Sequence, residues 1–87
     1  MVPTTGRIVL YTLSEYDAES INKRRVPQDG NSATVGDVLP AVIIRPWGNT
    51  EAASANLQVL LDGTGSYWAT SRSQGDEPGQ WHEPPRV

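Results

Sequence analysis

The chain contains no cysteine, which excludes disulfide bonds and any zinc site built on thiolates. His82 is the only histidine, so a histidine-rich metal site within one chain is excluded as well. No apolar stretch approaches the roughly 20 residues of a membrane-spanning helix. The first residues, Met1 to Gly6, have neither the basic start nor the apolar centre of a signal peptide. These absences predict a soluble intracellular protein with no metal or other cofactor and no membrane partner.

Basic residues are also scarce, and the net charge is −3. Binding to extended nucleic acid needs a basic face, so the composition argues against it but leaves room for a local basic pocket. With 87 residues the chain is expected to form one domain over 1–87. A domain this small is usually stabilised by disulfides, metals or self-association, and only self-association remains. We therefore expect a homo-oligomer.

The clearest local pattern is a β-hairpin over Ala55–Arg72. The apolar run Leu57–Leu61 leads into an Asp-Gly turn, and the aromatic and β-branched run Ser66–Arg72 returns. A second apolar run, Val38–Arg45, lies close enough upstream to pair with the hairpin. Its β-branched centre, from Val42 to Ile44, is expected to be the core strand.

The N-terminal part predicts a strand followed by a helix. The strand, Arg7–Leu13, is apolar on both faces, which is typical of a strand covered on both sides. Ser14 is a candidate helix N-cap with Asp17 as its capping-box partner. Pro27 ends the helix near Arg25. The apolar face of this helix is thin, consisting of Tyr16, Ala18 and Ile21.

Together these elements predict an α+β fold. We expect a small antiparallel sheet or an SH3-like barrel, with one helix inserted after the first strand. Residues 1–6 would form an N-terminal arm, and residues 73–87 would form a proline-rich tail. Trp81 is too large and apolar to remain in water, so it is expected to anchor that tail.

No set of residues predicts an enzyme. Ser71, His82 and an acid could be written as a triad, but no nucleophile-elbow pattern surrounds the serine. There is no glycine-rich loop with a following lysine to hold phosphate, and no EF-hand spacing. The pair Asp76 and Glu77 is typical of a solvated turn.

Arginines beside aromatic residues indicate a ligand site instead. An aromatic ring can stack on a base, a guanidinium can pair with phosphate, and small polar groups can contact a sugar. The residues that fit this description are Arg24, Arg25, Arg45, Trp47, Asn49, Tyr67, Trp68, Ser71 and Arg72. Structural roles remain open for the aromatic residues and the arginines among them. The aromatic residues could be core or interface residues, the helix-end arginines could be solvated, and Arg45 and Arg72 could pair with acids.

The order of several motifs resembles that of small proteins from actinobacterial phages and prophages. The motifs are Gly6-Arg7-Ile8-Val9, Tyr11-Thr12-Leu13-Ser14, Gly36-Asp37, Leu61-Asp62-Gly63, Tyr67–Arg72 and the ending with Trp81, Pro84 and Arg86-Val87. The resemblance implies a phage origin. It implies no particular activity, but together with the arginines beside aromatic residues it leads us to expect a non-enzymatic protein in the cytoplasm of the infected host cell. That protein would sequester a small anionic ligand, a nucleotide second messenger of immunity, at a subunit interface.

The alternative is a structural protein of the virion, such as a capsid decoration or head–tail joining protein, whose partners would be capsid proteins. A third hypothesis is an inhibitor that docks on a host protein through the helix and the Trp81 tail.

Overall fold

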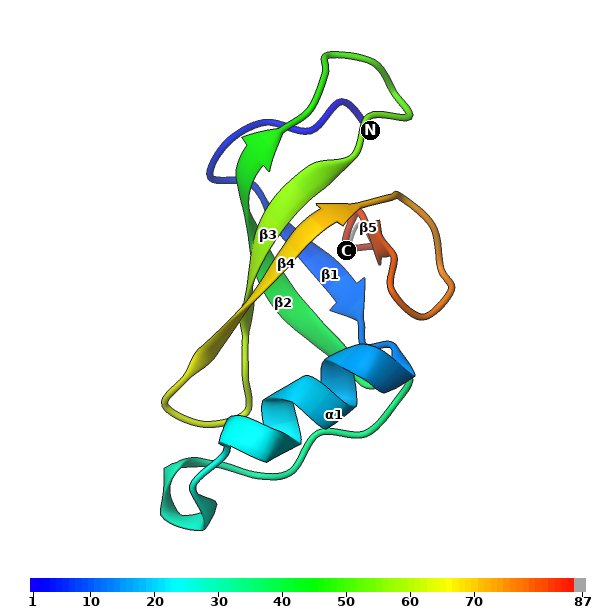
Figure 1. Cartoon of the computed structure of the whole chain (residues 1–87). Helices are drawn as coiled ribbons and strands as arrows, with labels where there is room; N and C mark the ends of the chain where they lie inside the picture. The colour runs from blue at the N-terminus through cyan, green and yellow to red at the C-terminus, as the bar shows by residue number, and fades with distance from the viewer. Residues whose placement is uncertain (86–87) are drawn as a thin grey trace.

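The computed structural model describes residues 1–85, which form one antiparallel five-stranded sheet and one α-helix (Figure 1). This confirms the α+β class. The order of strands across the sheet is β4-β3-β2-β1-β5. In chain order the elements are β1 (Ile8–Thr12), α1 (Glu15–Arg24), the 3-10 turn η1 (Pro27–Asp29), β2 (Val38–Pro46), β3 (Ala55–Leu60), β4 (Ser66–Arg72) and β5 (Trp81–His82).

The two strongest strand predictions are confirmed. The hairpin consists of β3 and β4, with the Asp-Gly pair in the turn between them. The strand β2 lies at the centre of the sheet, between β3 and β1. Both predictions rest on local patterns of apolar, β-branched and turn-forming residues, which need little help from distant parts of the chain.

The sheet has one buried face and one open face, which we call the inner and outer faces. Directly paired residues share a face. The row Val9, Ala41, Val59 and Tyr67 crosses four strands and is buried. The adjacent row, on the outer face, consists of Ile8, Val42, Gln58 and Trp68. Ile8 is 47% exposed and Trp68 is 56% exposed. The expectation that the first strand is covered on both sides is therefore wrong at Ile8, although Thr12, on the same face of the strand, is buried.

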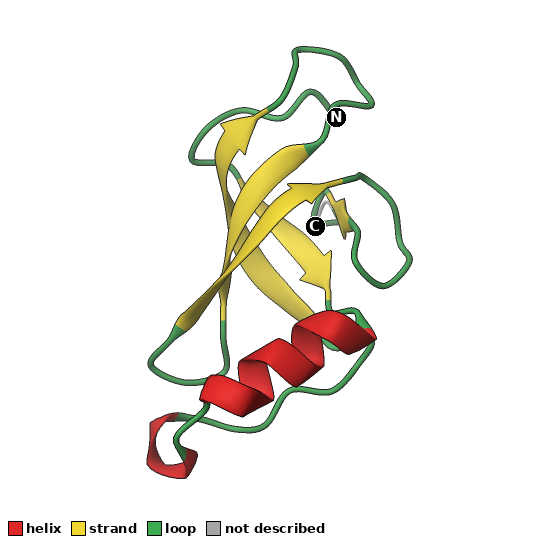
Figure 2. Ribbon diagram, in the orientation of Figure 1, coloured by secondary structure: helices red, strands yellow, loops and turns green. Residues whose placement is uncertain are grey.

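The helix lies across one end of the sheet (Figure 2). Ser14 and Asp17 form the predicted capping box, and Arg25 is the C-cap. Ile21 belongs to the core, as expected of the apolar face. Tyr16 is 70% exposed, so its assignment to that face is wrong. No helix within residues 1–85 is long and apolar enough to cross a membrane.

The C-terminal segment returns to the sheet as β5, a strand that the sequence did not predict. Trp81 is fully buried in the core and donates a hydrogen bond from Nε1 to the Arg72 carbonyl at 2.9 Å. An isolated parallel bridge also joins Gln74 to Trp81. The two edges of the sheet thus approach each other, but the sheet is not closed, and the SH3-like barrel is not confirmed.

Candidate functional site

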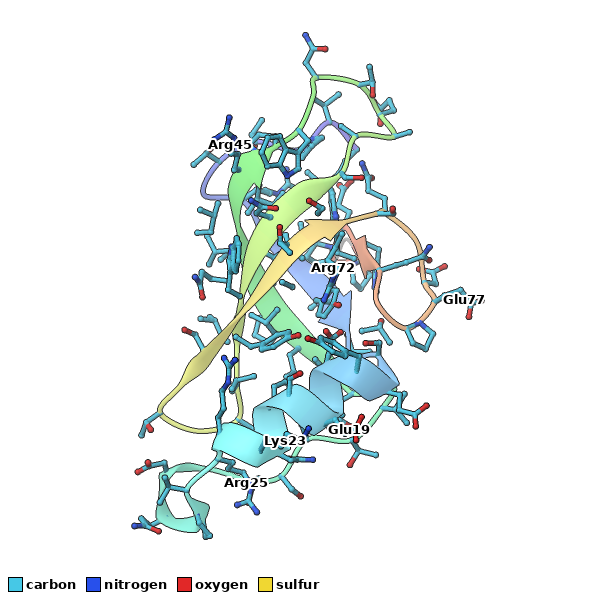
Figure 3. The ribbon with its side chains drawn as sticks, in the orientation of Figure 1. Glu19, Lys23, Arg25, Arg45, Arg72 and Glu77 are labelled. Atoms are coloured by element: carbon cyan, nitrogen blue, oxygen red, sulfur yellow. The ribbon has the colours of Figure 1, made fainter. Side chains whose placement is uncertain are left out.

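The nine residues predicted to bind a ligand do not form one site. Arg45, Trp47 and Ser71 lie near one end of the outer face, with Trp68 further along it. Asn49 is exposed in the loop that follows Trp47. Tyr67 and Arg72 reach the inner face. Arg24 and Arg25 lie at the end of α1, where they line a hollow together with Tyr67. Figure 3 shows Arg45 and Arg25 at opposite ends of the molecule.

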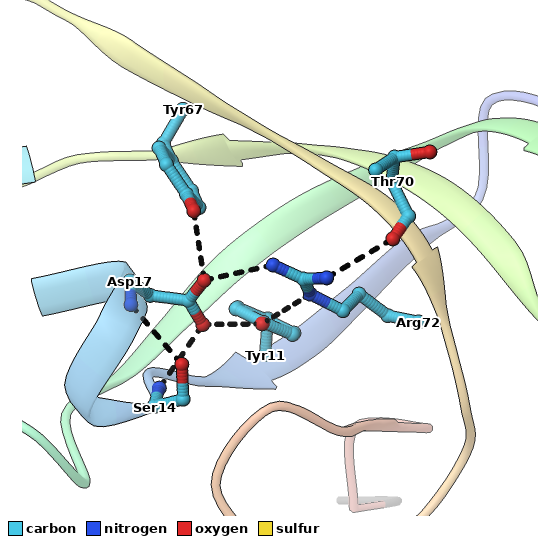
Figure 4. A network of polar contacts seen from close by, with 6 residues as sticks. All are labelled: Tyr11, Ser14, Asp17, Tyr67, Thr70 and Arg72. Atoms are coloured by element: carbon cyan, nitrogen blue, oxygen red, sulfur yellow. Dashed lines mark hydrogen bonds and ion pairs between the residues drawn. The ribbon is translucent and has the colours of Figure 1, made fainter. Parts of the chain in front are cut away.

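The inner group is built around Asp17, a fully buried carboxylate on α1 (Figure 4). Its Oδ1 accepts hydrogen bonds from Tyr67 Oη at 2.8 Å and from Arg72 Nη2 at 2.9 Å. Its Oδ2 accepts from the backbone N–H of Ser14 at 3.0 Å and from the hydroxyl of Tyr11. Arg72 Nε in turn donates to Tyr11 Oη at 2.8 Å. We call these five residues the Asp17 network.

The contacts in this network stabilise the charged carboxylate and the neutral phenols. Burial alone would raise the pKa of Asp17, but hydrogen bonds from Tyr11, Ser14 and Tyr67 outweigh it and lower that pKa. Burial and the bond to Asp17 raise the pKa of both tyrosines. Asp17 is therefore an anion at neutral pH.

The Asp17 carboxylate is saturated. A carboxylate offers about four acceptor positions, and Asp17 uses four of them on protein donors. No acceptor remains for a ligand. The network instead ties α1 to β1 and β4, which makes its role structural. Tyr67 and Arg72 belong to it and are engaged.

The outer group is built around Asn56, which sequence reasoning did not single out. Its Oδ1 accepts three hydrogen bonds, from Ser71 N at 2.7 Å, Trp47 Nε1 at 2.9 Å and Thr70 Oγ1 at 3.0 Å. These donors come from both sides of β3. No local signal could have found this residue, because its three partners meet only when the sheet has formed.

Asn56 lies opposite two irregularities of the sheet. On one side the β2–β3 register shifts between Ile43 and Arg45. On the other, Thr70 and Ser71 of β4 stand opposite Asn56 alone, so β4 carries a β-bulge. Ser71 has φ +54, in the left-handed region that non-glycine residues rarely adopt. The bond from Ser71 N to Asn56 supports this conformation.

Two tryptophans of the outer face are about half-exposed. Trp47 is 51% exposed, and the Arg45 guanidinium carbon lies 4.4 Å from the centre of one of its rings. Asn56 fixes the edge of this indole through Nε1. Trp68 lies opposite Gln58, two residues along β3 from Asn56, a step of about 7 Å. The two rings therefore belong to the same part of the face, which we call the outer aromatic site (Arg45, Trp47, Asn56, Trp68 and Thr70).

Acidic residues are absent from the strands of this sheet. All ten aspartates and glutamates lie in α1, in η1 or in loops. Arg45 has no acid within 4.0 Å among residues 1–85. In a chain of net charge −3, the strands of the outer face thus carry no carboxylate that would repel an anion.

Other chemistry finds little support in the geometry. Within residues 1–85, no group of three or more histidine, aspartate or glutamate side chains could hold a metal ion. His82 Nδ1 lies 3.6 Å from Asp76, and no hydrogen bond in the described part of the chain joins it to Ser71.

Comparison with known proteins found no family model, no curated protein and no solved structure that matches this chain.

Proposed function

We propose that this protein binds a small anionic ligand with a planar ring, of the nucleotide class, at the outer aromatic site. The proposal rests on one observation. A half-exposed indole is fixed by Asn56 and stacked against a guanidinium with no acid partner in the described chain, in a sheet whose strands carry no acids.

Each part of the site offers one interaction to such a ligand. The exposed ring of Trp68 can stack on a base, which contributes about 1–3 kcal/mol in nucleic-acid-binding proteins. Arg45 keeps its N–H groups free of protein acceptors in residues 1–85 and can donate them to a phosphate. Gln58 and Thr70 flank the rings and can bond to polar edges of the ligand.

With the phage resemblance, the site fits a protein that sequesters a nucleotide second messenger of immunity in the cytoplasm of an infected host. Sequestration requires binding without cleavage, in line with a sequence that offers no catalytic set. A homo-oligomer would place two outer faces together and enclose the ligand, as the exposed rings favour.

Calorimetric titration against cyclic dinucleotides and ADP-ribose derivatives tests the proposal. We expect at least one of them to bind, and Trp68→Ala to weaken that binding by about fivefold or more, since 1 kcal/mol corresponds to roughly that factor. Arg45→Gln should weaken binding of the phosphate ligand but not of the matching uncharged nucleoside. Arg7→Gln is the matched control, because Arg7 is exposed but pairs with Glu83.

Absence of binding to the whole panel at tens of micromolar protein would contradict the proposal. Equal binding of an uncharged oligosaccharide would also contradict it, because stacking on tryptophan would then suffice without Arg45.

A second candidate function is a structural role in the virion. The apolar side chains of the outer face, such as Ile8, Ile44 and Leu60, are each close to half-exposed, which favours a protein partner. Mass spectrometry of purified particles separates the two functions. A capsid decoration protein would be present in many copies, and a sequestering protein would be absent.

A further inference from the structure

A hollow lies away from the outer aromatic site, between the end of α1, η1 and the β3–β4 turn. It has a volume of about 170 Å³. Apolar cavities of roughly 150 Å³ hold a molecule the size of benzene, so this hollow can take a body of that size. Ile21, Leu61 and Tyr67 supply apolar surface, and Arg24 and Arg25 supply positive charge. We call it the helix-end hollow.

The walls of the hollow are held together by the backbone. Gly30 and Gly63 form an isolated antiparallel bridge. Asn31 N donates to the Asp62 carbonyl at 2.9 Å, and Thr64 N donates to the Asp29 carbonyl at 2.8 Å. These bonds join η1 to the hairpin turn, so the shape of the hollow exists before any ligand arrives.

Its two arginines lack acidic partners. Among residues 1–85, neither Arg24 nor Arg25 has a carboxylate within 4.0 Å. Arg25 is fixed by a bond from Nη1 to the Gly30 carbonyl at 3.1 Å, while its buried Nε has no hydrogen-bond partner in that range. The carboxylate of Asp62, which also lines the hollow, already accepts a bond from Asn31 at 2.9 Å.

We infer that the helix-end hollow binds a small organic monoanion, a carboxylate attached to an apolar body of about one ring. The guanidinium groups hold the carboxylate, and the apolar wall holds the ring. A single charge fits better than a phosphate dianion, because Asp29 and Asp62 line the same hollow and repel a dianion more strongly than a monoanion. This site is separate from the outer aromatic site and does not depend on the proposed function.

Three ring compounds of nearly the same shape test the inference: benzoate, neutral benzamide and cationic benzamidinium. Each is titrated into the whole ¹⁵N-labelled protein while the backbone amide shifts are followed. We expect benzoate to give saturable shifts at Gly30, Gly63 and neighbouring amides, and to bind more tightly than the other two. Benzamide binding as tightly as benzoate, or benzoate shifts that never saturate, would overturn the inference.

A pair of variants tests the role of charge. Arg24→Gln should weaken benzoate binding by roughly threefold, as expected for an exposed ion pair. Lys23→Gln removes the same charge from the adjacent, exposed position, which does not line the hollow, and should leave binding unchanged. Thermal unfolding confirms that both variants fold. Equal weakening in the two variants would mean that only the general field of the helix end matters, and would refute a site on Arg24.

Discussion

Replacing the buried carboxylate of Asp17 by an amide should severely destabilise the protein. In Asp17→Asn, the neutral side chain keeps one acceptor oxygen and gains an N–H₂ group. Whichever way the amide turns, two of the four donors lose their acceptor, and the Arg72 guanidinium loses its counter-charge.

The magnitude follows from the burial of the pair. Removing one partner of a buried ion pair costs about 3–5 kcal/mol. The Arg72 side chain is still 24% exposed, and water can solvate part of its charge, so we take the lower end, about 3 kcal/mol. Domains are stable by only about 5–15 kcal/mol, so this is a large fraction.

Urea unfolding followed by tryptophan fluorescence measures this loss. With a slope of about 1 kcal/mol per molar urea, the midpoint should fall by roughly 3 M. The matched control is Glu19→Gln, which neutralises an exposed acid on the same helix and should cost less than about 0.5 kcal/mol. A loss below about 1 kcal/mol in Asp17→Asn would refute the view that the network holds the helix to the sheet.

The remaining predictions concern the pH dependence of folding stability and the glycines of the β3–β4 turn. Because the pKa of Asp17 is lower in the folded state, the contribution of this residue to folding stability is complete above its unfolded pKa near 4. That contribution is lost as the pH falls through the lowered, folded-state pKa. In urea titrations, the difference in unfolding free energy between the wild type and Asp17→Asn should therefore shrink as the pH falls from about 5 to about 2. The pKa values of Tyr11 and Tyr67 are raised in the folded state, so their effect on stability has the opposite pH dependence, and stability should fall as the pH rises above about 10. Tyr67→Phe should make this fall of stability with pH less steep. Gly63→Ala would place a Cβ in a steric clash with the Asp29 carbonyl oxygen and should cost about 1–3 kcal/mol. Gly65→Ala, whose Cβ meets nothing closer than 3.9 Å, should cost less than about 0.5 kcal/mol in the same assay.

The sequence predicted the elements whose signals are local. The capping box of Ser14 and Asp17 spans four residues, and the β3–β4 hairpin is one continuous segment. The fifth strand was missed because β5 is only two residues long and is defined by its pairing with β1. A strand this short carries no periodicity of its own.

The candidate site was only partly predictable, because residue type does not reveal a side chain's partner. Asp17 was recognised as a capping residue, yet it also forms an ion pair with Arg72, 55 positions away. Arg45 and Arg72 both stand near aromatic residues in the sequence. Only the fold shows that Arg72 is paired with the buried Asp17, whereas Arg45 has no acid partner within residues 1–85.

The β-bulge explains how β4 serves both faces. Along β4, Tyr67 and Ala69 point inward while Trp68 and Thr70 point outward. Strict alternation would turn Arg72 outward as well, because it lies an even number of residues from Trp68. The extra residue at Thr70–Ser71 shifts the phase by one, and Arg72 turns inward to Asp17.

Asn56 fixes this bulge and, through the same oxygen, the indole of Trp47. The buried amide of Asn56 therefore keeps Arg72 away from the outer face and orients the indole of Trp47 on that face. The structural network and the proposed ligand site are two consequences of the same irregularity in β4.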